Sequence, residues 1–433
     1  MPRGYLPPLS TLDPSRRPAW LIPAHLLGVV LLQGVITAVV FILPVIARRQ
    51  FSASAGQTLL ITAAPTVFFV FSIFWHAWLK RVGLKRYIAT YWVLGSAPLL
   101  LAPLAEGFGT LLALHLIASV GGAGWPALHG ELLKKMYPDA TRGRMYAMLS
   151  AGAMLGGAGA SWLVGHLLTE NPGSFRWYMP AAAVLMAAGS ALMALVAHTL
   201  RADDGGSTSG STHVLRGLID PIVHMREILR ADRVFARYEA AFMTYGVGWM
   251  ICYALVPLLV TDKLKLPYDQ TASATHVAFL LAAVCATFPA GLLMDKLGAT
   301  RASGVCFALY MLYPLGLIFA SSAGELALAS VVYGICSAGV SVGWMLGPVS
   351  LAPTPAKVPH YVAIHATMVG LRGTVFQGVG VLLYALTASF TAALLLAAAA
   401  FAWGAWQMWT LHRIMVPRRP AVMVPDAGVA EVE

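Results

Sequence analysis

Long apolar runs separated by short polar segments cover most of the chain. A helix that crosses a bilayer needs roughly 20 mainly apolar residues, and twelve segments of roughly this length follow one another along the sequence. They are 20–47, 57–79, 87–104, 110–133, 145–168, 177–200, 235–260, 272–293, 302–321, 325–350, 362–386 and 390–411. This pattern predicts an all-α membrane protein with twelve transmembrane helices.

The longest polar interruption, 201–233, divides the predicted helices into two sets of six. It opens with Asp, Gly, Ser and Thr, a composition typical of flexible linkers. Within 219–230 the apolar side chains share one helical face opposite two arginines, which predicts an amphipathic helix on a membrane surface. We therefore expect an N-terminal six-helix bundle at 1–200, a linker with an amphipathic helix at 201–233, and a C-terminal six-helix bundle with a tail at 234–433.

Composition agrees with this pattern, and the positions of the charges add a topology. Only 11% of the residues are charged and the mean hydropathy is +0.73, whereas soluble domains carry about 25% charged residues. Of the 29 Lys and Arg residues, 23 lie at the two termini, in the central linker or in the loops that share their side, and 5 lie on the other side. Because positive charge stays in the cytoplasm, both termini are expected there. The expected location of the protein is a plasma membrane, most simply a bacterial inner membrane. The net charge of +11 then indicates topology and attraction to anionic lipid, and not nucleic-acid binding.

No pattern of catalytic or metal-binding residues stands out in the sequence. The four cysteines lie in apolar segments, at spacings that suit neither a zinc site nor a disulfide framework. Nucleophile elbows, phosphate loops and His-Glu-x-x-His motifs do not occur. The first 18 residues lack the apolar core of a cleavable signal peptide. We therefore expect neither an enzyme nor a cofactor or metal site.

A short charged turn occurs twice, between the second and third and between the eighth and ninth predicted helices. The first copy, 76–86, reads HAWLKRVGLKR, and the second, 291–301, reads GLLMDKLGATR. Gly298 and Arg301 of the second copy match Gly83 and Arg86 of the first, each 215 positions earlier. A charged turn repeated at half-length indicates a duplicated membrane protein.

The second copy resembles the loop signature of the major facilitator superfamily, Gly-x-Leu-x-Asp-(Lys/Arg)-x-Gly-x-x-(Arg/Lys). The first copy departs from it, with His76 in place of the first Gly and Lys80 in place of the Asp. Together with the six-plus-six arrangement, this makes nearly the whole chain resemble that family. The resemblance implies two bundles that rock about a substrate site near the midplane. It also implies gating by both turns, with Asp295 capping the N-terminus of a helix, most simply the eleventh.

The loop between the fourth and fifth helices carries further candidate gating residues. Glu131 and Lys135 are four residues apart on one helical face and are expected to pair. Arg144 follows after Pro138 and Gly143, which end one helix and allow the next to begin. Two interpretations stay open: a charge network between helices that gates transport, or charges solvated in the headgroup region.

Arg372 is the one Lys or Arg inside a predicted span, in the eleventh helix. It lies twelve residues after His360, about 18 Å along a helix axis, and therefore close to the midplane. A charge at that depth costs at least ~2.5 kcal/mol and faces a cavity or a partner. One interpretation is a structural contact, either with Glu239 or with backbone carbonyls. The other is a clamp for an anionic substrate group, for which the guanidinium is better suited than an ammonium.

Further polar residues inside the spans complete the candidate site. Gln33, midway along the first helix, either faces the central cavity or bonds across helices. His115 and His365 lie deep enough to bind substrate or carry a proton, and Tyr245 is expected in the cavity wall. Glu239 is a candidate proton-coupling carboxylate together with His365.

These observations favour a secondary active transporter of a small organic solute, preferably one with an anionic group, coupled to protons. Its expected partners are the solute, protons and membrane lipids, and the expected state is a monomer. Ala118 replaces the arginine that proton-coupled relatives place in helix four, and helix five lacks a Gly-Pro pair, which weakens a drug:proton antiporter. His166 and His276, near the outer ends of their helices, are interpreted as hydrogen-bonded core residues. Two alternatives stay open: an exporter of hydrophobic or cationic compounds, and a receptor or assembly factor that transports nothing.

Overall fold

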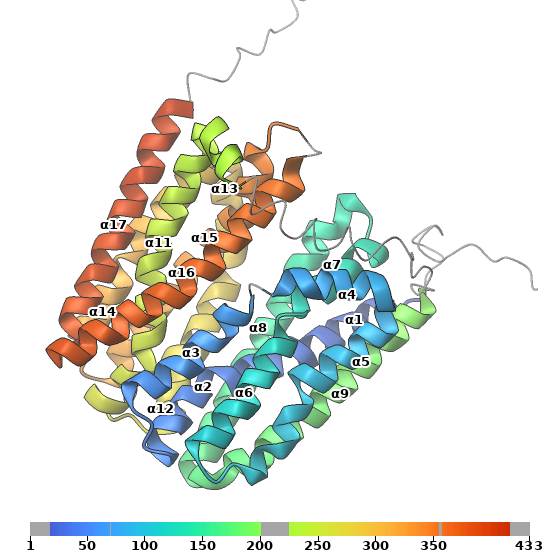
Figure 1. The fold of residues 1–433 in the computed structure, drawn as a ribbon, viewed down its shortest axis with the longest axis vertical. Coiled ribbons are helices and arrows are strands. Elements are labelled where there is room, and N and C mark those ends of the chain that lie inside the picture. The colour runs from blue at the N-terminus through green and yellow to red at the C-terminus, as the bar shows by residue number, and fades with distance from the viewer. Residues whose placement is uncertain (1–17, 70, 201–224, 355–356, 416–433) are drawn as a thin grey trace, which may run out of the picture.

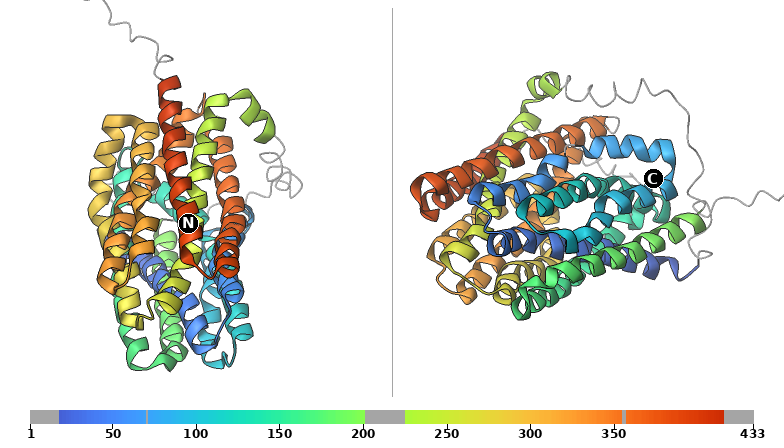
Figure 2. Two further views of the ribbon diagram at one scale, coloured as in Figure 1. Left: turned by 90° about the vertical axis from the view of Figure 1, so that its left-hand side faces the viewer. Right: turned by 60° about the horizontal axis from the view of Figure 1, so that its bottom comes forward.

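The computed structural model describes residues 18–69, 71–200, 225–354 and 357–415. This part of the chain is helical throughout, without a β-strand. Blue-to-green helices of the first half form one bundle and yellow-to-red helices of the second half form another, side by side with it (Figure 1). The right-hand view of Figure 2 shows the same division from a different direction.

The first bundle contains six consecutive helical segments, several of them composite. They are α1 (Leu21–Val29) continued by the π-helix η3 (Val30–Gly34) and α2 (Val35–Gln50); α3 (Ala55–Phe69) with α4 (Ser72–Val82); α5 (Leu84–Gly95) with the 3₁₀-helix η4 (Ala97–Leu104); α6 (Phe108–Gly122) with α7 (Trp125–Met136); α8 (Asp139–Glu170); and η5 (Pro172–Ser174) with α9 (Phe175–Thr199).

The second bundle is also built from consecutive helical segments, one of which includes Gly298 of the second charged turn. Its segments are α11 (Arg233–Leu258) with the π-helix η6 (Leu259–Lys263); α12 (Tyr268–Thr271) with the π-helix η7 (Ala272–Val277) and α13 (Ala278–Tyr310); α14 (Leu312–Phe319); α15 (Ala323–Leu351); α16 (Val358–Thr387); and α17 (Phe390–Met415).

Ten helices of the described part are long and apolar enough to cross a membrane, and the bent pair α3–α4 makes eleven if it is one span. The longest of them, Tyr268–Phe319, has 52 residues, or about 78 Å of helix, against a bilayer core of about 30 Å. Its backbone is non-helical at Gly298. The all-α membrane fold is therefore confirmed, and the count of twelve stays a prediction that depends on dividing this segment at Gly298.

The two copies of the charged turn have the same backbone geometry. Gly83 has φ 77° and ψ 164°, and Gly298 has φ 75° and ψ 162°. They are the only glycines with positive φ in the described ranges. This region of conformational space is essentially restricted to glycine. The repeat in the sequence is thus a repeat in structure.

Replacing Gly298 by Ala is expected to destabilise the protein. No atom lies within 4 Å of a Cβ added there, so the cost comes from the backbone alone and amounts to roughly 1–3 kcal/mol. Gly291→Ala is the matched control, since its added Cβ also meets nothing and its helical backbone accepts Ala. Thermal unfolding in detergent should give a lower Tm for Gly298→Ala only. Equal Tm values would contradict the backbone argument.

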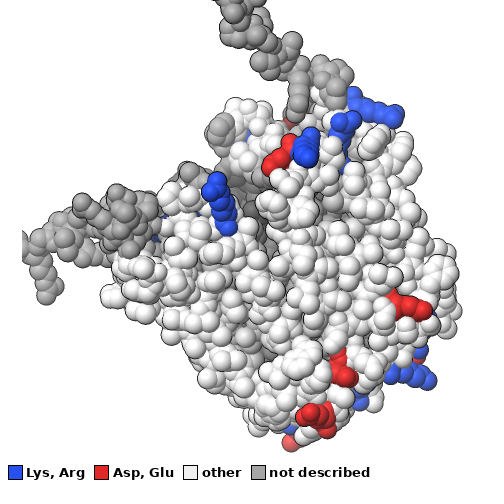
Figure 3. Space-filling model, turned by 180° about the vertical axis from the view of Figure 1, so that it is seen from behind, with Lys and Arg blue, Asp and Glu red and all other residues white. Residues whose placement is uncertain are grey.

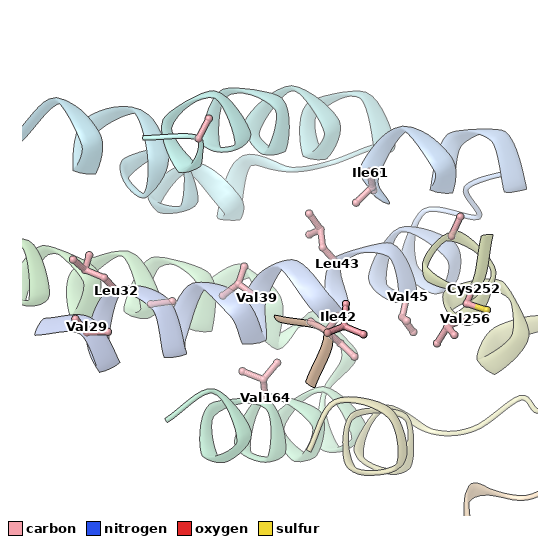
Figure 4. Packing of buried hydrophobic residues seen from close by; sticks show 14 of the residues in the cluster. Val29, Leu32, Val39, Ile42, Leu43, Val45, Ile61, Val164, Cys252 and Val256 are labelled. Carbon is pink, nitrogen blue, oxygen red and sulfur yellow. The ribbon is translucent and has the colours of Figure 1, made fainter. Parts of the chain in front are cut away.

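Apolar side chains fill both bundles and the contact between them. Figure 4 shows Ile42 and Val45 of α2 near Cys252 and Val256 of α11, with Val164 of α8 on another side of α2. Charged side chains gather at the two ends of the molecule in Figure 3, and the wide surface between them is uncharged. This distribution suits a protein whose middle faces lipid hydrocarbon.

The predicted linker is described only from residue 225 onward, so 201–224 lie outside the described residues. Residues 225–231 are helical. Met225, Ile228 and Leu229 pack against Phe235 of α11 and against a buried pair on α16. In this described part of the linker, the apolar face of the helix is partly covered by protein.

Candidate functional site

A cavity of about 480 Å³ lies between the two bundles and is lined by both. Its first-half walls include Pro65 and Thr66 of α3 and Tyr146 of α8, while Tyr245 and Arg372 belong to the second half. We call it the central cavity. It is large enough for a small organic molecule.

A second cavity of about 290 Å³ shares Trp249, Phe279 and Tyr333 with the central cavity. Its other lining residues include Pro44 and Pro257, which lie within a few residues of the ends of α2 and α11. We call it the aromatic chamber. The two cavities therefore adjoin, with three aromatic side chains between them.

Arg372 of α16 is held in the wall of the central cavity with part of its donor capacity unused. Its side chain is only 5% exposed, its Nη1 donates to the carbonyl of Phe242, and its Cζ lies 5.7 Å from the ring centre of Tyr245. Its Nε has no hydrogen-bond partner among the described residues. Space for the guanidinium depends on Gly246, because an added Cβ there would lie 2.2 Å from Cζ.

Glu239 of α11 and His365 of α16 form a buried acid–imidazole pair. His365 Nδ1 lies 2.8 Å and 3.0 Å from the two carboxylate oxygens, and both residues are 1% exposed. His365 Nε2 has no partner in the described part of the chain. The rings of Phe242 and Trp344 lie 5.2 Å and 5.4 Å from the imidazole. A proton bound by this pair would be shielded from bulk water.

The structure brings Arg372, His365, Glu239 and Tyr245 close together, although only Arg372 and Tyr245 of these four line the central cavity, and it leaves two predicted residues elsewhere. Gln33 donates to Tyr91 Oη at 3.3 Å, which is the alternative of a bond across helices. His115 is buried inside the first bundle, where its Nε2 lies 3.0 Å from the carbonyl of Ile61. Neither residue lines the central cavity, because each faces a neighbouring helix of its own bundle.

The predicted gating residues lie at the end that carries the two repeated turns, which we call the repeat-turn end. Asp295, Arg301, Arg86 and Arg144 are exposed. Helix α16 begins at Val358, and its N-cap residue Lys357 makes no side-chain capping hydrogen bond, so a cap by Asp295 stays a prediction. Glu131 and Lys135 form the expected i,i+4 pair at 3.3 Å.

The opposite end joins the two bundles through an ion pair that sequence reasoning missed. Arg48 Nη2, near the end of α2, donates to both carboxylate oxygens of Asp262, in η6, at 2.6 Å and 2.7 Å. Tyr384 of α16 donates to the same carboxylate at 3.0 Å. We call this contact the Arg48–Asp262 latch. Its partners are 214 positions apart, so no local pattern announces it.

Further contacts between the bundles surround the latch. Arg49 donates to the carbonyl of Leu266, and its guanidinium lies 4.6 Å from the ring centre of Tyr268. Thr169 Oγ1 donates to Asp269 and accepts from the Asp269 amide, both at 2.9 Å. This end is therefore held closed by several polar contacts.

Two further contacts join the bundles. His276 Nδ1 hydrogen-bonds to Ser161 Oγ at 2.6 Å, and its ring stacks on Phe41 at 4.1 Å. Gln377 Nε2 donates to Thr66 Oγ1 at 3.1 Å. His276 is buried and hydrogen-bonded as expected, but its partners lie in the other bundle.

Three π-helical segments carry residues of these contacts. Gln33 lies in η3, Asp262 in η6 and His276 in η7. A π-helical turn widens the helix locally and is frequent at functional sites. The amino-acid sequence contains no signal from which these segments could have been found.

The family model of the Major Facilitator Superfamily matches residues 26–381, most of the chain. The chain belongs to the Major Facilitator Superfamily. It is therefore a multi-pass membrane protein of a transporter family, and the fold and family support secondary transport. No curated protein sequence matches it.

Solved transporters share this superfamily fold at low sequence identity. A peptide transporter POT in complex with sulfate superposes with a TM-score of 0.72 at 14% identity, over 94% of this chain and 99% of that one. The nucleoside transporter NupG, as a mutant, gives 0.69 at 13%, over 90% and 99%. The human organic anion transporter MFSD10 (TETRAN) gives 0.64 at 14%, over 90% and 100%. At these identities the likeness concerns the fold.

Proposed function

We propose that this superfamily member transports a small organic anion by alternating access, driven by a proton gradient. The observation that carries the proposal is the buried guanidinium of Arg372, which lines the cavity between the bundles with an unpartnered Nε. The buried Glu239–His365 pair lies close to it, with Glu239 on α11 and His365 on α16, the helix of Arg372.

An anionic substrate fits the donors that Arg372 still offers. Nη1 is used by the carbonyl of Phe242, while Nε points to no acceptor among the described residues. Nε is enclosed by protein in this state, so a carboxylate or sulfonate would bind Nη2 first and would accept from Nε as well once the side chain moves; such bidentate contacts are short and strong. A cationic substrate would instead meet a fixed positive charge in a cavity of low polarity.

Proton coupling fits the Glu239–His365 pair. The carboxylate and the imidazole lie 2.8 Å apart, so the two groups can share a proton. The pair lies on α11 and α16, and Arg372 projects from α16 two helical turns beyond His365. A proton on the pair and an anion on Arg372 would therefore alter the charge of the same buried region.

The pattern of contacts supports a state closed at the latch end. The Arg48–Asp262 latch and its neighbours hold that end together, whereas Asp295 and Arg301 at the repeat-turn end are exposed. With the termini in the cytoplasm, this is a state closed to the outside. The repeated turns would then form their contacts when the bundles rock to the other state.

We expect Asp262→Asn to favour opening at the latch end. Losing an ionic contact of this kind costs about 1–2 kcal/mol, which shifts an equilibrium roughly 5- to 30-fold. Cys252, which lines the aromatic chamber, should then react faster with an impermeant maleimide added outside intact cells, as read by mass spectrometry of its peptide.

The control for this measurement is Glu325→Gln. Glu325 lies at the same end, but its carboxylate accepts from Ser321 within its own bundle. It should leave the labelling of Cys252 unchanged. If Asp262→Asn also leaves it unchanged, the latch does not hold this end closed.

Uptake into proteoliposomes tests the function itself. Hexane-1-sulfonate and tetraethylammonium are permanent ions that do not cross lipid unaided, so their entry reports on the protein. We expect protein-dependent entry of hexane-1-sulfonate that rises with an inward proton gradient and falls with a protonophore. Entry of tetraethylammonium alone would favour an exporter of cations, and no entry of either ion would favour a non-transporting protein.

A further inference from the structure

The aromatic chamber is an apolar compartment lined by several aromatic rings. Its described lining contains no Asp, Glu, Lys or Arg. Its rings come from both bundles: Phe41, Trp249, Tyr253, His276, Phe279, Tyr313 and Tyr333. A compartment of this composition favours a flat apolar group over a hydrated or charged one.

Ring geometry inside the chamber shows that it already accommodates stacking. Phe41 and His276 stack across the bundles with 4.1 Å between ring centres and 7° between planes. Phe279 and Tyr313 each stack on Tyr333, at 4.5 Å and 4.6 Å. These distances are typical of favourable aromatic pairs. A further ring in the chamber would pack against the remaining faces and edges of these pairs.

Two hydroxyl groups give the chamber a small amount of hydrogen-bonding capacity. Tyr253 and Tyr313 both line it, and no hydrogen bond of either hydroxyl is found within the described ranges. The hydroxyl of Tyr333, in contrast, accepts from Trp249 Nε1 at 2.6 Å. The chamber can thus orient a polar substituent on a ring without presenting a charge to it.

Arg372 and the chamber are close enough for one molecule to reach both. Tyr245, against which the guanidinium lies, and Tyr253 of the chamber are eight residues apart on α11, or about 12 Å along the helix. Trp249 lies midway between them and lines both cavities. A ring joined to an anionic group by a short chain matches this separation.

We propose that the aromatic chamber binds an aromatic ring of the substrate, which makes the substrate an aromatic or heteroaromatic anion. Its anionic group binds Arg372, and its ring passes the Trp249–Tyr333 contact to stack in the chamber. This inference rests on the proposed transport of an anion, because Arg372 fixes the other end of the molecule.

The test measures binding to the full-length protein in nanodiscs by calorimetry. The probes are 3-phenylpropionate and 3-cyclohexylpropionate, which have the same chain and charge but differ in the ring. 3-Phenylpropionate is expected to bind about fivefold to tenfold more tightly than 3-cyclohexylpropionate, because only its flat ring can stack on the aromatic faces of the chamber.

Variants locate the effect. Phe41→Leu keeps an apolar side chain but removes one stacking face, and it should reduce the ratio of the two affinities to about twofold or less. Phe74→Leu is the control, because Phe74 is exposed on the outer surface and lines another groove. If Phe41→Leu fails to fold, Trp249→Leu gives the same comparison from α11.

The outcomes separate this inference from the proposed function. Equal binding of the two acids, with both weakened in Arg372→Lys, would overturn the aromatic site and leave anion transport standing. If 3-phenylpropylamine binds as tightly as 3-phenylpropionate and Phe41→Leu weakens both, the ring site is supported and the anionic substrate is overturned. A preference for 3-cyclohexylpropionate would overturn the stacking argument outright.

Discussion

Arg372→Lys is expected to raise the apparent KM for hexane-1-sulfonate by roughly 10- to 100-fold, or about 1.4–2.8 kcal/mol. A lysine ammonium carries the same charge but cannot form the planar, two-pronged contact of a guanidinium. In the wild type, one prong holds the carbonyl of Phe242 and the others remain for the substrate. A lysine that bonds to this carbonyl turns its only nitrogen away from the anion.

Arg176→Lys provides the control for this change. Arg176 of α9 lies outside both cavities and donates to the carbonyl of Ala105 at 3.3 Å. It should leave uptake within twofold of the wild type, as surface substitutions generally do. An unchanged KM in Arg372→Lys would show that Arg372 is only a structural contact, and the anion proposal would fail with it.

Gly246→Ala tests the same site without changing any charge. The added Cβ would overlap the guanidinium of Arg372, so the side chain must move out of the cavity wall. Gly378→Ala, on the helix of Arg372, meets no atom within 4 Å and is its counterpart. Only the first of these should weaken binding.

The main architecture could be predicted from the sequence because it depends on local patterns. Apolar runs define spans, and the turn at Gly83 and Gly298 recurs with matching φ and ψ. Arg372 could be found as well, since a charged side chain inside an apolar run has few places to go except a cavity.

The remaining features depend on contacts that no local pattern contains. Arg48 and Asp262 follow closely after the predicted segments 20–47 and 235–260, and only the folded bundles place them 2.6 Å apart. His115 and His365 both lie deep in apolar helices, but a rotation about the helix axis directs one towards Ile61 and the other towards Glu239. Which face of a helix meets the cavity is decided by packing between bundles.

Glu239→Gln is expected to abolish concentrative uptake while leaving exchange of substrate across the membrane largely intact. Glutamine fills the same volume and can still hydrogen-bond to a neutral His365, so the pair should stay packed. It cannot, however, stabilise a protonated imidazole in a buried site, where an unpaired charge is costly. The pair would then no longer bind the proton of the proposed coupling.

Two measurements on the same proteoliposomes distinguish proton-driven uptake from exchange of substrate. Net uptake of hexane-1-sulfonate under an inward proton gradient should fall at least about tenfold in Glu239→Gln, because this variant no longer binds the coupling proton. Counterflow, in which unlabelled substrate inside exchanges for labelled substrate outside, should remain within about threefold, because Arg372 and both cavities are untouched. Glu106→Gln, an exposed carboxylate, should affect neither. If gradient-driven uptake survives in Glu239→Gln, the Glu239–His365 pair is a structural contact, and the coupling proton binds elsewhere or does not exist.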